Sequence, residues 1–273
     1  WTAGVNEIFK GKTLSQVRHL FGAFLVDPRT DLRPRITVKV AKEYLPQAFD
    51  SRTKWPSCVH AIRNQGQCGS CWAFSSSEAL SDRFCIASSG AVNVILSPQD
   101  LVSCDTNDYG CQGGYLDKLW EYVQKEGLVT DDCFPYKSYS GGSYACPFKD
   151  GKKQCTESGV SYKKYYAKKE PISFLGSIDT SMQEIMTNGP IQTGFRVYQD
   201  FFSYKKGVYH HVSGGFAGGH AVKVIGWGHD STSNKDYWIV ANSWGNTWGI
   251  DGYFWIQKGS DECAIETQMI TGH

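Results

Sequence analysis

A change of pattern near residue 190 constrains the fold of this chain most, because helical periodicity precedes it and short β-rich runs follow it. Before it, Ala73, Ser77, Leu80 and Phe84 recur at the spacing of one helical face. After it, apolar runs separated by Gly, Asn and Asp predict strands over 191–198, 221–227, 237–242 and 252–257. A helical part followed by a β part predicts an α+β architecture.

Further helices are predicted from their start and stop signals. Residues 97–100, Ser-Pro-Gln-Asp, supply a cap, a proline at the first helical position and an acidic group in the first turn. Residues 116–123 carry apolar side chains at helical spacing and are followed by Gly127. Residues 181–187 begin with a serine and are followed by Gly189. We expect the helix that begins near residue 70 to be the central, buried one.

Residues 1 to about 44 differ from the rest of the chain, since they contain no cysteine and include a stretch over 27–39 that is rich in Pro and Arg. The stretch 13–25 has apolar residues at helical spacing, with Thr13 as the expected cap. These features predict an appended, extended segment with one short amphipathic helix. Such a helix needs a surface on which to lie.

The charge and composition exclude several classes of protein. Lys and Arg number 28 and Asp and Glu 27, which gives a net charge of +1 and no case for nucleic-acid binding. No apolar run approaches the roughly 20 residues that a membrane span requires. Ten cysteines are many for a reducing compartment, so we expect a secretory route to a lysosome-like or vacuolar compartment, or out of the cell.

The segment from Gln65 to Phe74 carries the strongest chemical signal, because it places Cys71 in the first turn of the central helix. Unpaired backbone N–H groups and the positive end of the helix dipole stabilise a thiolate at such a position. Two other interpretations exist, in which Cys68 and Cys71 form a redox pair or half of a zinc site. A redox pair would suit a βαβ pattern, and a zinc site would need a second ligand cluster. Neither feature is present in the sequence.

A base for Cys71 is found at His220, which follows two glycines and opens a predicted strand. After another strand come Asn242 and Trp244. An Asn side chain can fix the orientation of an imidazole, and a neighbouring indole can shield that contact from water. The other histidines lack such surroundings and are interpreted as surface or local structure: His19, His60, His210, His211, His229 and His273.

With Gln65, Cys71, His220 and Asn242 each inside its local motif and in the family's order, the chain resembles the papain family of cysteine proteases. The resemblance implies a two-lobed fold, with a helical left lobe that holds the central helix, a β-barrel-like right lobe and an active-site cleft between them. It implies a cysteine endopeptidase that hydrolyses peptide bonds through an acyl-enzyme.

The resemblance also implies individual roles in the cleft. Gln65 and the backbone N–H of Cys71 would form the oxyanion hole. Trp244 would cover the contact between Asn242 and His220. Gly113 and Gly114 would line the substrate cleft.

Several segments resemble the cathepsin B branch of the family in particular. They are Leu45-Pro46, Phe49-Asp50, Trp55-Pro56, Asp82-Arg83, Gly207-Val208-Tyr209 and Asp261-Glu262-Cys263. The disulfides implied by this resemblance are Cys58–Cys85, Cys68–Cys111, Cys104–Cys146 and Cys133–Cys155. Cys71 then remains as the nucleophile and Cys263 as a free, buried thiol.

Two departures from cathepsin B bear on specificity. Cathepsin B owes its exopeptidase activity to an inserted loop with two adjacent histidines, and the matching stretch 133–155 contains no histidine. We therefore expect endopeptidase activity with little or no dipeptide release from C-termini. Gln268 stands where cathepsin B has a glutamate, and Gly194, Leu116 and Ala221 match the other positions of the second unprimed pocket. A roomy apolar pocket is expected.

The domain organisation follows from the resemblance. Residues 1–44 resemble the cathepsin B propeptide and are expected to inhibit, and residues 45–273 form the peptidase domain. Its helical lobe would span roughly 56–155 and its β lobe roughly 156–260, with terminal segments crossing between them. The alternative for 1–44 is a flexible leader without an inhibitory role.

The expected partners are protein and peptide substrates and the chain's own propeptide, with no cofactor, metal, nucleic acid or membrane. We expect a monomer. Two rival functions stay open at this point. They are a binding protein on a protease scaffold and a thiol–disulfide exchange enzyme.

Overall fold

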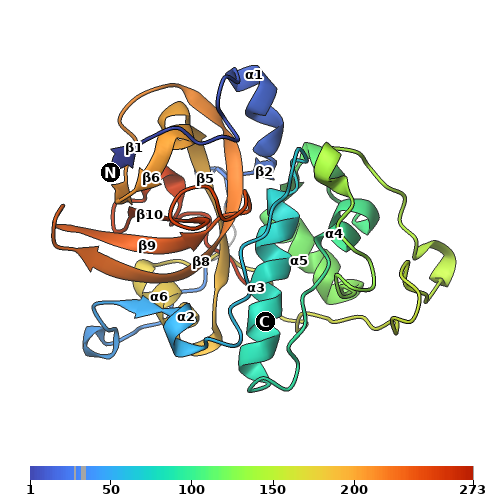
Figure 1. Ribbon diagram of the computed structural model, residues 1–273. Helices are drawn as coiled ribbons and strands as arrows, with labels where there is room; N and C mark the ends of the chain where they lie inside the picture. Colours follow the sequence, from blue (N-terminus) through green and yellow to red (C-terminus); the bar gives the residue numbers. More distant parts are fainter. Residues whose placement is uncertain (28, 32–34, 273) are drawn as a thin grey trace.

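The computed structural model describes residues 1–27, 29–31 and 35–272, and its sheet and most of its helices lie side by side (Figure 1). The helices are α1 (Leu14–Val17), α2 (Ser51–Lys54), α3 (Cys71–Ala87), α4 (Pro98–Cys104), α5 (Leu116–Lys125) and α6 (Ile178–Asn188). The strands are β1 (Thr2–Ala3), β2 (Ala23–Phe24), β3 (Phe49–Asp50), β4 (Gly114–Tyr115), β5 (Ile191–Tyr198), β6 (Tyr204–Lys206), β7 (Val208–Tyr209), β8 (Phe216–Asp230), β9 (Lys235–Ala241) and β10 (Tyr253–Gln257).

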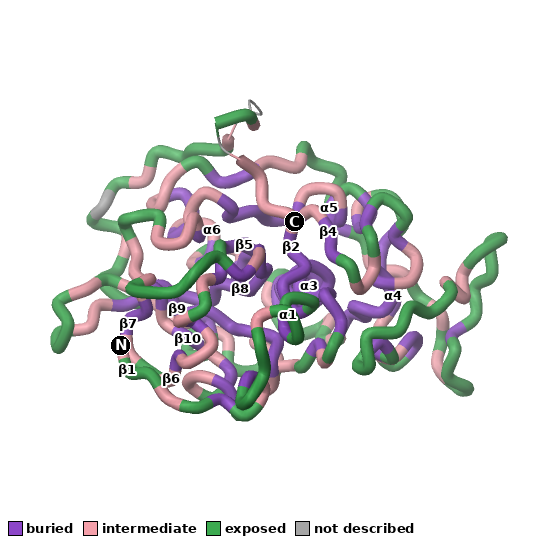
Figure 2. The backbone as a smooth tube through the Cα atoms, turned by 90° about the horizontal axis from the view of Figure 1, so that it is seen from above, coloured by how far each residue is buried: buried purple, intermediate pink, exposed green. Residues whose placement is uncertain are grey.

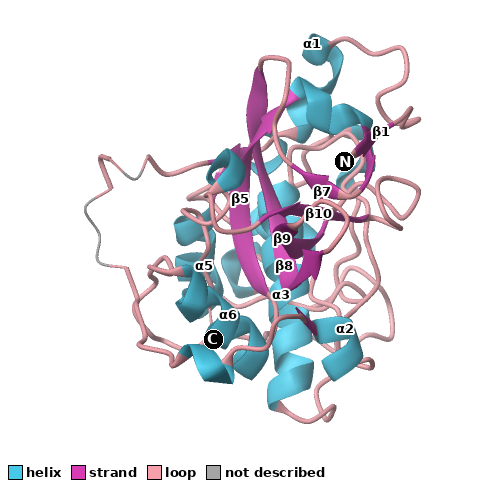
Figure 3. Ribbon diagram, turned by 90° about the vertical axis from the view of Figure 1, so that its left-hand side faces the viewer, coloured by secondary structure: helices cyan, strands magenta, loops and turns pink. Residues whose placement is uncertain are grey.

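The β lobe is built on the long strand β8, which pairs with β3, β5 and β9. The order β3-β8-β9-β10-β7, with β5 on the other side of β8, makes one six-stranded sheet (Figure 3). Large side chains fill the core beside it, including Phe195, Trp227, Trp238 and Phe254. The predicted strands are confirmed, although β8 extends well beyond the run 221–227 from which it was predicted.

The helical lobe is arranged around α3, which is buried at every residue from Cys71 to Arg83 (Figure 2). A helix enclosed on all sides must satisfy its polar side chains internally. The hydroxyls of Ser75, Ser76 and Ser81 do so by donating to backbone carbonyls one turn earlier. The prediction of a central, buried helix is therefore confirmed.

The other predicted helices are present, with one difference at a boundary. Ser97 caps α4, because its hydroxyl accepts a hydrogen bond from the Asp100 N–H at 3.1 Å. Helix α6 begins at Ile178, earlier than the expected residue 181. Its cap is Ser177, whose hydroxyl accepts from the Thr180 N–H at 3.1 Å.

A buried ionic cluster joins the two lobes where α3 meets β8. Lys223 Nζ lies 2.6 Å from Asp82 Oδ2 and 4.0 Å from Glu78 Oε2. His60 Nδ1 lies 2.6 Å from the other oxygen of Asp82. Buried charges need such partners, so the cluster ties the central helix to the strand that carries His220.

The N-terminal segment is less helical than predicted. Its α-helix ends at Val17, a 3-10 turn covers Arg18–Leu20, and the chain then extends into β2. The expectation of a helix over 13–25 was therefore wrong beyond residue 20. The reason is that the β2 backbone pairs with β4 of the helical lobe, in parallel, while Gly22 bridges to Gly219 of the β lobe.

The structure contains the four disulfides that the resemblance implied. They are Cys58–Cys85, Cys68–Cys111, Cys104–Cys146 and Cys133–Cys155. Because Cys68 is bonded to Cys111, it cannot form a redox pair with Cys71. Cys71 is free and buried, whereas the free Cys263 is only partly buried, contrary to expectation. Within the part of the chain that the structure describes, no helix is long and apolar enough to cross a bilayer.

Candidate active site

Cys71 is the first residue of α3, at the helix end where backbone N–H groups lack intrahelical partners. Its side chain is fully buried in this structure. Burial raises the pKa of the Cys71 thiol to about 11, although the backbone N–H groups of Ala221 and Gly22, directed at the sulfur, lower it in part. In the form described, the thiol therefore holds its proton.

His220 lies on β8, immediately before the residue whose N–H is directed at the Cys71 sulfur. Its Nε2 donates to Asn242 Oδ1 at 2.7 Å, and the same oxygen accepts the Ser243 N–H at 2.8 Å. Because an amide oxygen only accepts, Nε2 carries the proton of the neutral ring. His220 Nδ1 is buried and without a hydrogen bond, so it is the nitrogen left to act as base.

The surroundings of His220 are apolar. The Trp244 ring lies 4.6 Å from the imidazole, centroid to centroid, and Phe21 of the N-terminal segment lies 6.2 Å away, edge-on. Burial lowers the pKa of His220 to about 4, against its hydrogen bond to the Asn242 side chain, which raises it. The imidazole and the Cys71 thiol are both favoured in their neutral forms here.

Gln65 is fully buried, and its amide is fixed from several sides. Its Oε1 accepts from Ser243 Oγ at 2.7 Å, and its Nε2 donates to the Cys68 carbonyl at 2.8 Å. The same Nε2 also donates to the carbonyl of Leu20 at 3.0 Å. A peptide carbonyl of the N-terminal segment thus accepts a hydrogen bond from Gln65 Nε2, the group that the resemblance assigned to an oxyanion hole.

The predicted cleft glycines lie where the N-terminal segment crosses between the lobes. Gly114 N–H donates to the Gly22 carbonyl at 2.8 Å. Gly113 has φ +127°, which only glycine adopts readily. A Cβ on Gly22 would lie 1.9 Å from the Gly69 carbonyl oxygen, so the segment approaches the enzyme backbone more closely than any side chain would permit.

The predicted pocket residues come together around one side chain of the N-terminal segment. A Cβ on Gly194 would lie 2.5 Å from Leu25 Cδ2, 3.3 Å from Leu116 Cδ1 and 3.7 Å from Gln268 Cβ. Ala221 lies opposite Gly194 in the β5–β8 ladder. The structure thus brings together the residues that the resemblance assigned to this pocket, and Leu25 of the N-terminal segment lies among them.

Gln268 does more than line this pocket. Its Oε1 accepts the Val26 N–H at 2.9 Å, and its Nε2 donates to the Val26 carbonyl at 2.7 Å. An amide can make both bonds because it is donor and acceptor at once, whereas a carboxylate can only accept. Gln268 therefore binds the backbone of the segment in the cleft.

Sequence reasoning missed two residues that hold Gln65 in place. One is Ser243, which stands beside Asn242 in the sequence and could have been found from that position. The other is Tyr136, whose hydroxyl donates to the Gln65 carbonyl at 2.8 Å. Nothing in the sequence marks Tyr136, because the pair is brought together only by folding.

The remaining histidines make local contacts away from the Cys71 sulfur. His60 bonds Asp82, His211 stacks on Tyr198, and His229 Nδ1 lies 2.8 Å from an Asp236 oxygen. His19 Nε2 lies 3.0 Å from Gln67 Oε1, His210 Nδ1 lies 3.1 Å from Lys235 Nζ, and His273 lies outside the described residues. Across residues 1–27, 29–31 and 35–272, no cluster of three or more His, Cys, Asp or Glu is arranged to hold a metal ion.

Comparisons with known proteins agree with this geometry. The sequence profile described as "Papain family cysteine protease" matches residues 45–273. The chain is 41% identical to "Cathepsin B-like CP3" of Giardia intestinalis, over all of this chain and 89% of that protein. It is 38% identical to "Cathepsin B-like cysteine proteinase 4" of Caenorhabditis elegans, over 97% of this chain and 87% of that protein.

Solved structures of precursor forms are similar over the full length. The procathepsin B S9 of Trypanosoma congolense superposes with a TM-score of 0.86 at 34% identity, covering all of this chain and 92% of that one. The digestive procathepsin L2 of Tenebrio molitor gives a TM-score of 0.77 at 29% identity, covering all of this chain and 84% of that one. The chain therefore belongs to the papain family of cysteine proteases and is cathepsin B-like.

Proposed function

We propose that the chain is the inactive precursor of a cysteine endopeptidase, with Cys71 as nucleophile, His220 as base and Asn242 as the group that orients the base. The observation that carries this proposal is the hydrogen bond from Gln65 Nε2 to the Leu20 carbonyl, at 3.0 Å. Through this bond, a peptide carbonyl is held by the side-chain amide of Gln65 in the site that also contains the Cys71 thiol and the His220 imidazole.

The reaction follows from these positions. Once residues 1–44 leave, solvent reaches the site, and the Cys71 proton moves to His220 Nδ1. The sulfur attacks the substrate carbonyl, and the developing oxyanion accepts hydrogen bonds from Gln65 Nε2 and the Cys71 N–H. The C–N bond then breaks as His220 gives its proton to the leaving amine. Water, deprotonated by His220, hydrolyses the thioester and frees Cys71.

The direction of the N-terminal segment supports its role as an inhibitor. Strand β2 runs parallel to β4, and the resemblance to the cathepsin B propeptide implies a segment that threads the cleft backwards relative to a substrate. A reversed chain fills the pocket with Leu25 and covers the donor of Gln65, but it does not present a bond for cleavage. Incubation near pH 4 to 5 is expected to release this segment near Tyr44 and Leu45 and to raise activity. Full activity in the uncleaved chain would contradict inhibition.

The stretch between Cys133 and Cys155 supports endopeptidase activity. It contains no histidine, and its part around the 3-10 turn Lys149–Gly151 extends away from the sheet on the far side of the helical lobe (Figure 1). The test compares quenched peptides with free and amidated C-termini. We expect similar kcat/KM for both, and a strong preference for the free carboxylate would indicate an exopeptidase instead.

The assignment of Cys71 is tested by substitution in the processed enzyme. Cys71→Ala is expected to abolish peptide hydrolysis while the circular dichroism spectrum and Tm stay those of the parent. The matched control is Cys263→Ala, which removes the other free thiol and should retain hydrolysis. Turnover that survives in Cys71→Ala would contradict the proposal.

We further propose that the protein is a monomer in a lysosome-like compartment or is secreted.

A further inference from the structure

We propose that Arg196 is a specificity-determining residue, which favours substrates with an acidic side chain just beyond the residue held in the apolar pocket. This inference rests on the proposed peptidase function and names a class of substrate for it. It concerns the outer end of the cleft, on the side of the pocket that faces away from Cys71.

The position of Arg196 follows from the alternation of β5. Its neighbours Phe195 and Val197 are fully buried in the β-lobe core, whereas Arg196 is exposed. Side chains two residues apart share a face of a strand, so Arg196 lies on the same face as Gly194, which lines the pocket. In the ladder with β8, Arg196 pairs with Gly219, the residue before His220.

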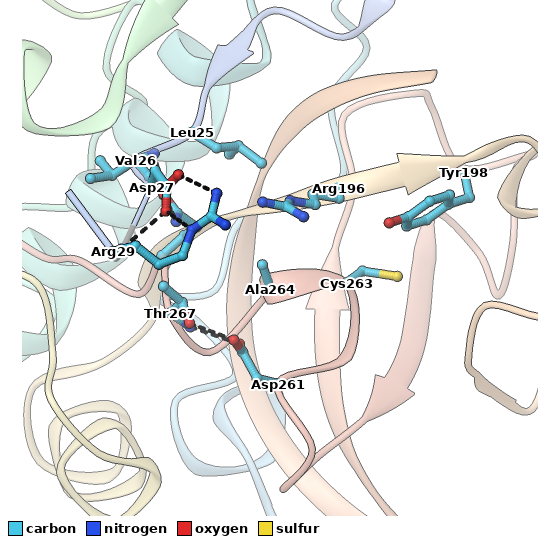
Figure 4. Close-up of a pocket in the computed structure, with 11 residues that line it drawn as sticks. Leu25, Val26, Asp27, Arg29, Arg196, Tyr198, Asp261, Cys263, Ala264 and Thr267 are labelled. Carbon is cyan, nitrogen blue, oxygen red and sulfur yellow. Dashed lines mark hydrogen bonds and ion pairs between the residues drawn. The ribbon is translucent and has the colours of Figure 1, made fainter. Parts of the chain in front are cut away.

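A pocket of about 480 Å³ opens beside Arg196. Its lining includes Leu25, Val26 and Asp27 of the N-terminal segment together with Arg196 and Gln268. Figure 4 shows the Arg196 side chain extending into this space, with its guanidinium toward Asp27 and Arg29. The cation therefore faces the chain that occupies the cleft.

The occupant already presents an acidic side chain at this place. Leu25 lies over Gly194, Gln268 holds the Val26 backbone, and Asp27 comes next. Asp27 is paired mainly with Arg29 of its own segment, at 2.7 Å, and the charge of Arg196 adds to its stabilisation as an anion. When residues 1–44 leave, Asp27 and Arg29 leave together, and Arg196 remains.

No ion pair joins Arg196 to another side chain in the part of the chain that the structure describes. Asp261 is the remaining carboxylate that lines the pocket. Its oxygens accept hydrogen bonds from the Glu266 N–H at 2.9 Å and from the backbone and hydroxyl of Thr267. That carboxylate is held by its own turn and leaves the guanidinium available to a substrate.

The size of the effect is limited by exposure, since ion pairs in contact with water contribute little. We expect a twofold to fivefold preference for Asp over Asn, roughly what an exposed pair provides. The preference should shrink as salt is added, because the Debye length falls to about 8 Å at physiological ionic strength.

The experiment uses the processed enzyme and pairs of peptides that differ only by Asp or Asn, at the third or the fourth residue before the scissile bond. The readout is the ratio of kcat/KM for Asp over Asn. It should be about twofold to fivefold for the parent at one of these positions, about one for Arg196→Gln and below one for Arg196→Glu. Lys206→Gln, an exposed cation on β6, is the matched control and should keep the parental ratio.

The outcomes separate the two claims. If the Asn peptides are hydrolysed and the ratio is the same in the parent and in Arg196→Gln at both positions, the role of Arg196 is refuted while the peptidase stands. If none of these peptides is hydrolysed by the processed enzyme, the proposed function fails, and the specificity inference fails with it.

Discussion

Replacing Gly22 by alanine should open the precursor, because the added methyl has no room. Its Cβ would lie 1.9 Å from the Gly69 carbonyl oxygen and 2.5 Å from the carbonyl carbon, whereas ordinary contacts begin near 3.4 Å. Both atoms are backbone and cannot rotate away. The segment must withdraw, which also strains the 2.8 Å hydrogen bond from the Gly114 N–H to the Gly22 carbonyl.

Overpacking of this kind typically costs about 1–3 kcal/mol. The cost falls on the closed form alone, because the methyl is free of contacts when the segment is released. Since 1.4 kcal/mol corresponds to a factor of ten, the population of the open form should rise by about 5- to 150-fold. Every reaction that requires an open cleft should accelerate by the same factor.

The assay is the rate at which iodoacetamide alkylates Cys71 in the uncleaved chain. A Cys263→Ala background removes the other free thiol, and intact mass confirms that residues 1–44 are still attached. The control is Gly142→Ala, which makes the same chemical change where the nearest atom, on Tyr144, lies 3.8 Å away. An alkylation rate in Gly22→Ala equal to that of the control would refute the idea that this close approach holds the segment in the cleft.

Two other predictions concern His220 and the buried cluster between the lobes. Asn242→Ala removes the 2.7 Å hydrogen bond to His220, and kcat/KM of the processed enzyme should fall about ten- to a hundredfold, the value of a lost bond to a charged partner; an unchanged rate would mean that His220 needs no orienting group. Burial raises the pKa of Glu78 to about 7, above its ordinary 4.5, so its contribution to stability is fully present below pH 4.5 and is lost as pH rises toward 7. In a Cys71→Ala background, Glu78→Gln should therefore reduce the loss of stability between pH 4.5 and pH 7. Relative to the chain that keeps Glu78, the free energy of unfolding in urea should increase by up to about 3 kcal/mol more at pH 7 than at pH 4.5. An unfolding free energy with the same pH dependence in both chains would contradict this.

The elements that could be predicted from the sequence are those determined by residues that lie close together in the chain. The start of α4 was predictable because Ser97 makes its cap within three residues. The strand over 191–198 was predictable because the residues that favour a strand and those that end it are neighbours in the sequence. The pocket that contains Gly194 and Leu116 was predicted from the family resemblance, and the structure brings these two residues together around Leu25.

The features that the sequence could not supply depend on contacts between distant segments. The helix over 13–25 ends at residue 20 because the following backbone bonds to both lobes, and periodicity carries no information about such partners. Tyr136 reaches Gln65 across 71 positions. Arg196 is an intermediate case, since its placement two residues after Gly194 puts it on the cleft face of a predicted strand.

On the proposed function, the N-terminal segment would suppress the chemistry in a second way, besides blocking access. Phe21 lies edge-on to His220 and 6.0 Å from Trp244, and it completes the apolar cover of the imidazole. Burial then lowers the pKa of His220 to about 4 and raises that of Cys71 to about 11, so proton transfer from sulfur to imidazole is unfavourable while the segment is bound. Removal of the segment lets water in, which stabilises both charges and brings the two pKa values toward each other. We infer that the same apolar contacts that hold the segment in place also keep the nucleophile protonated until the segment leaves.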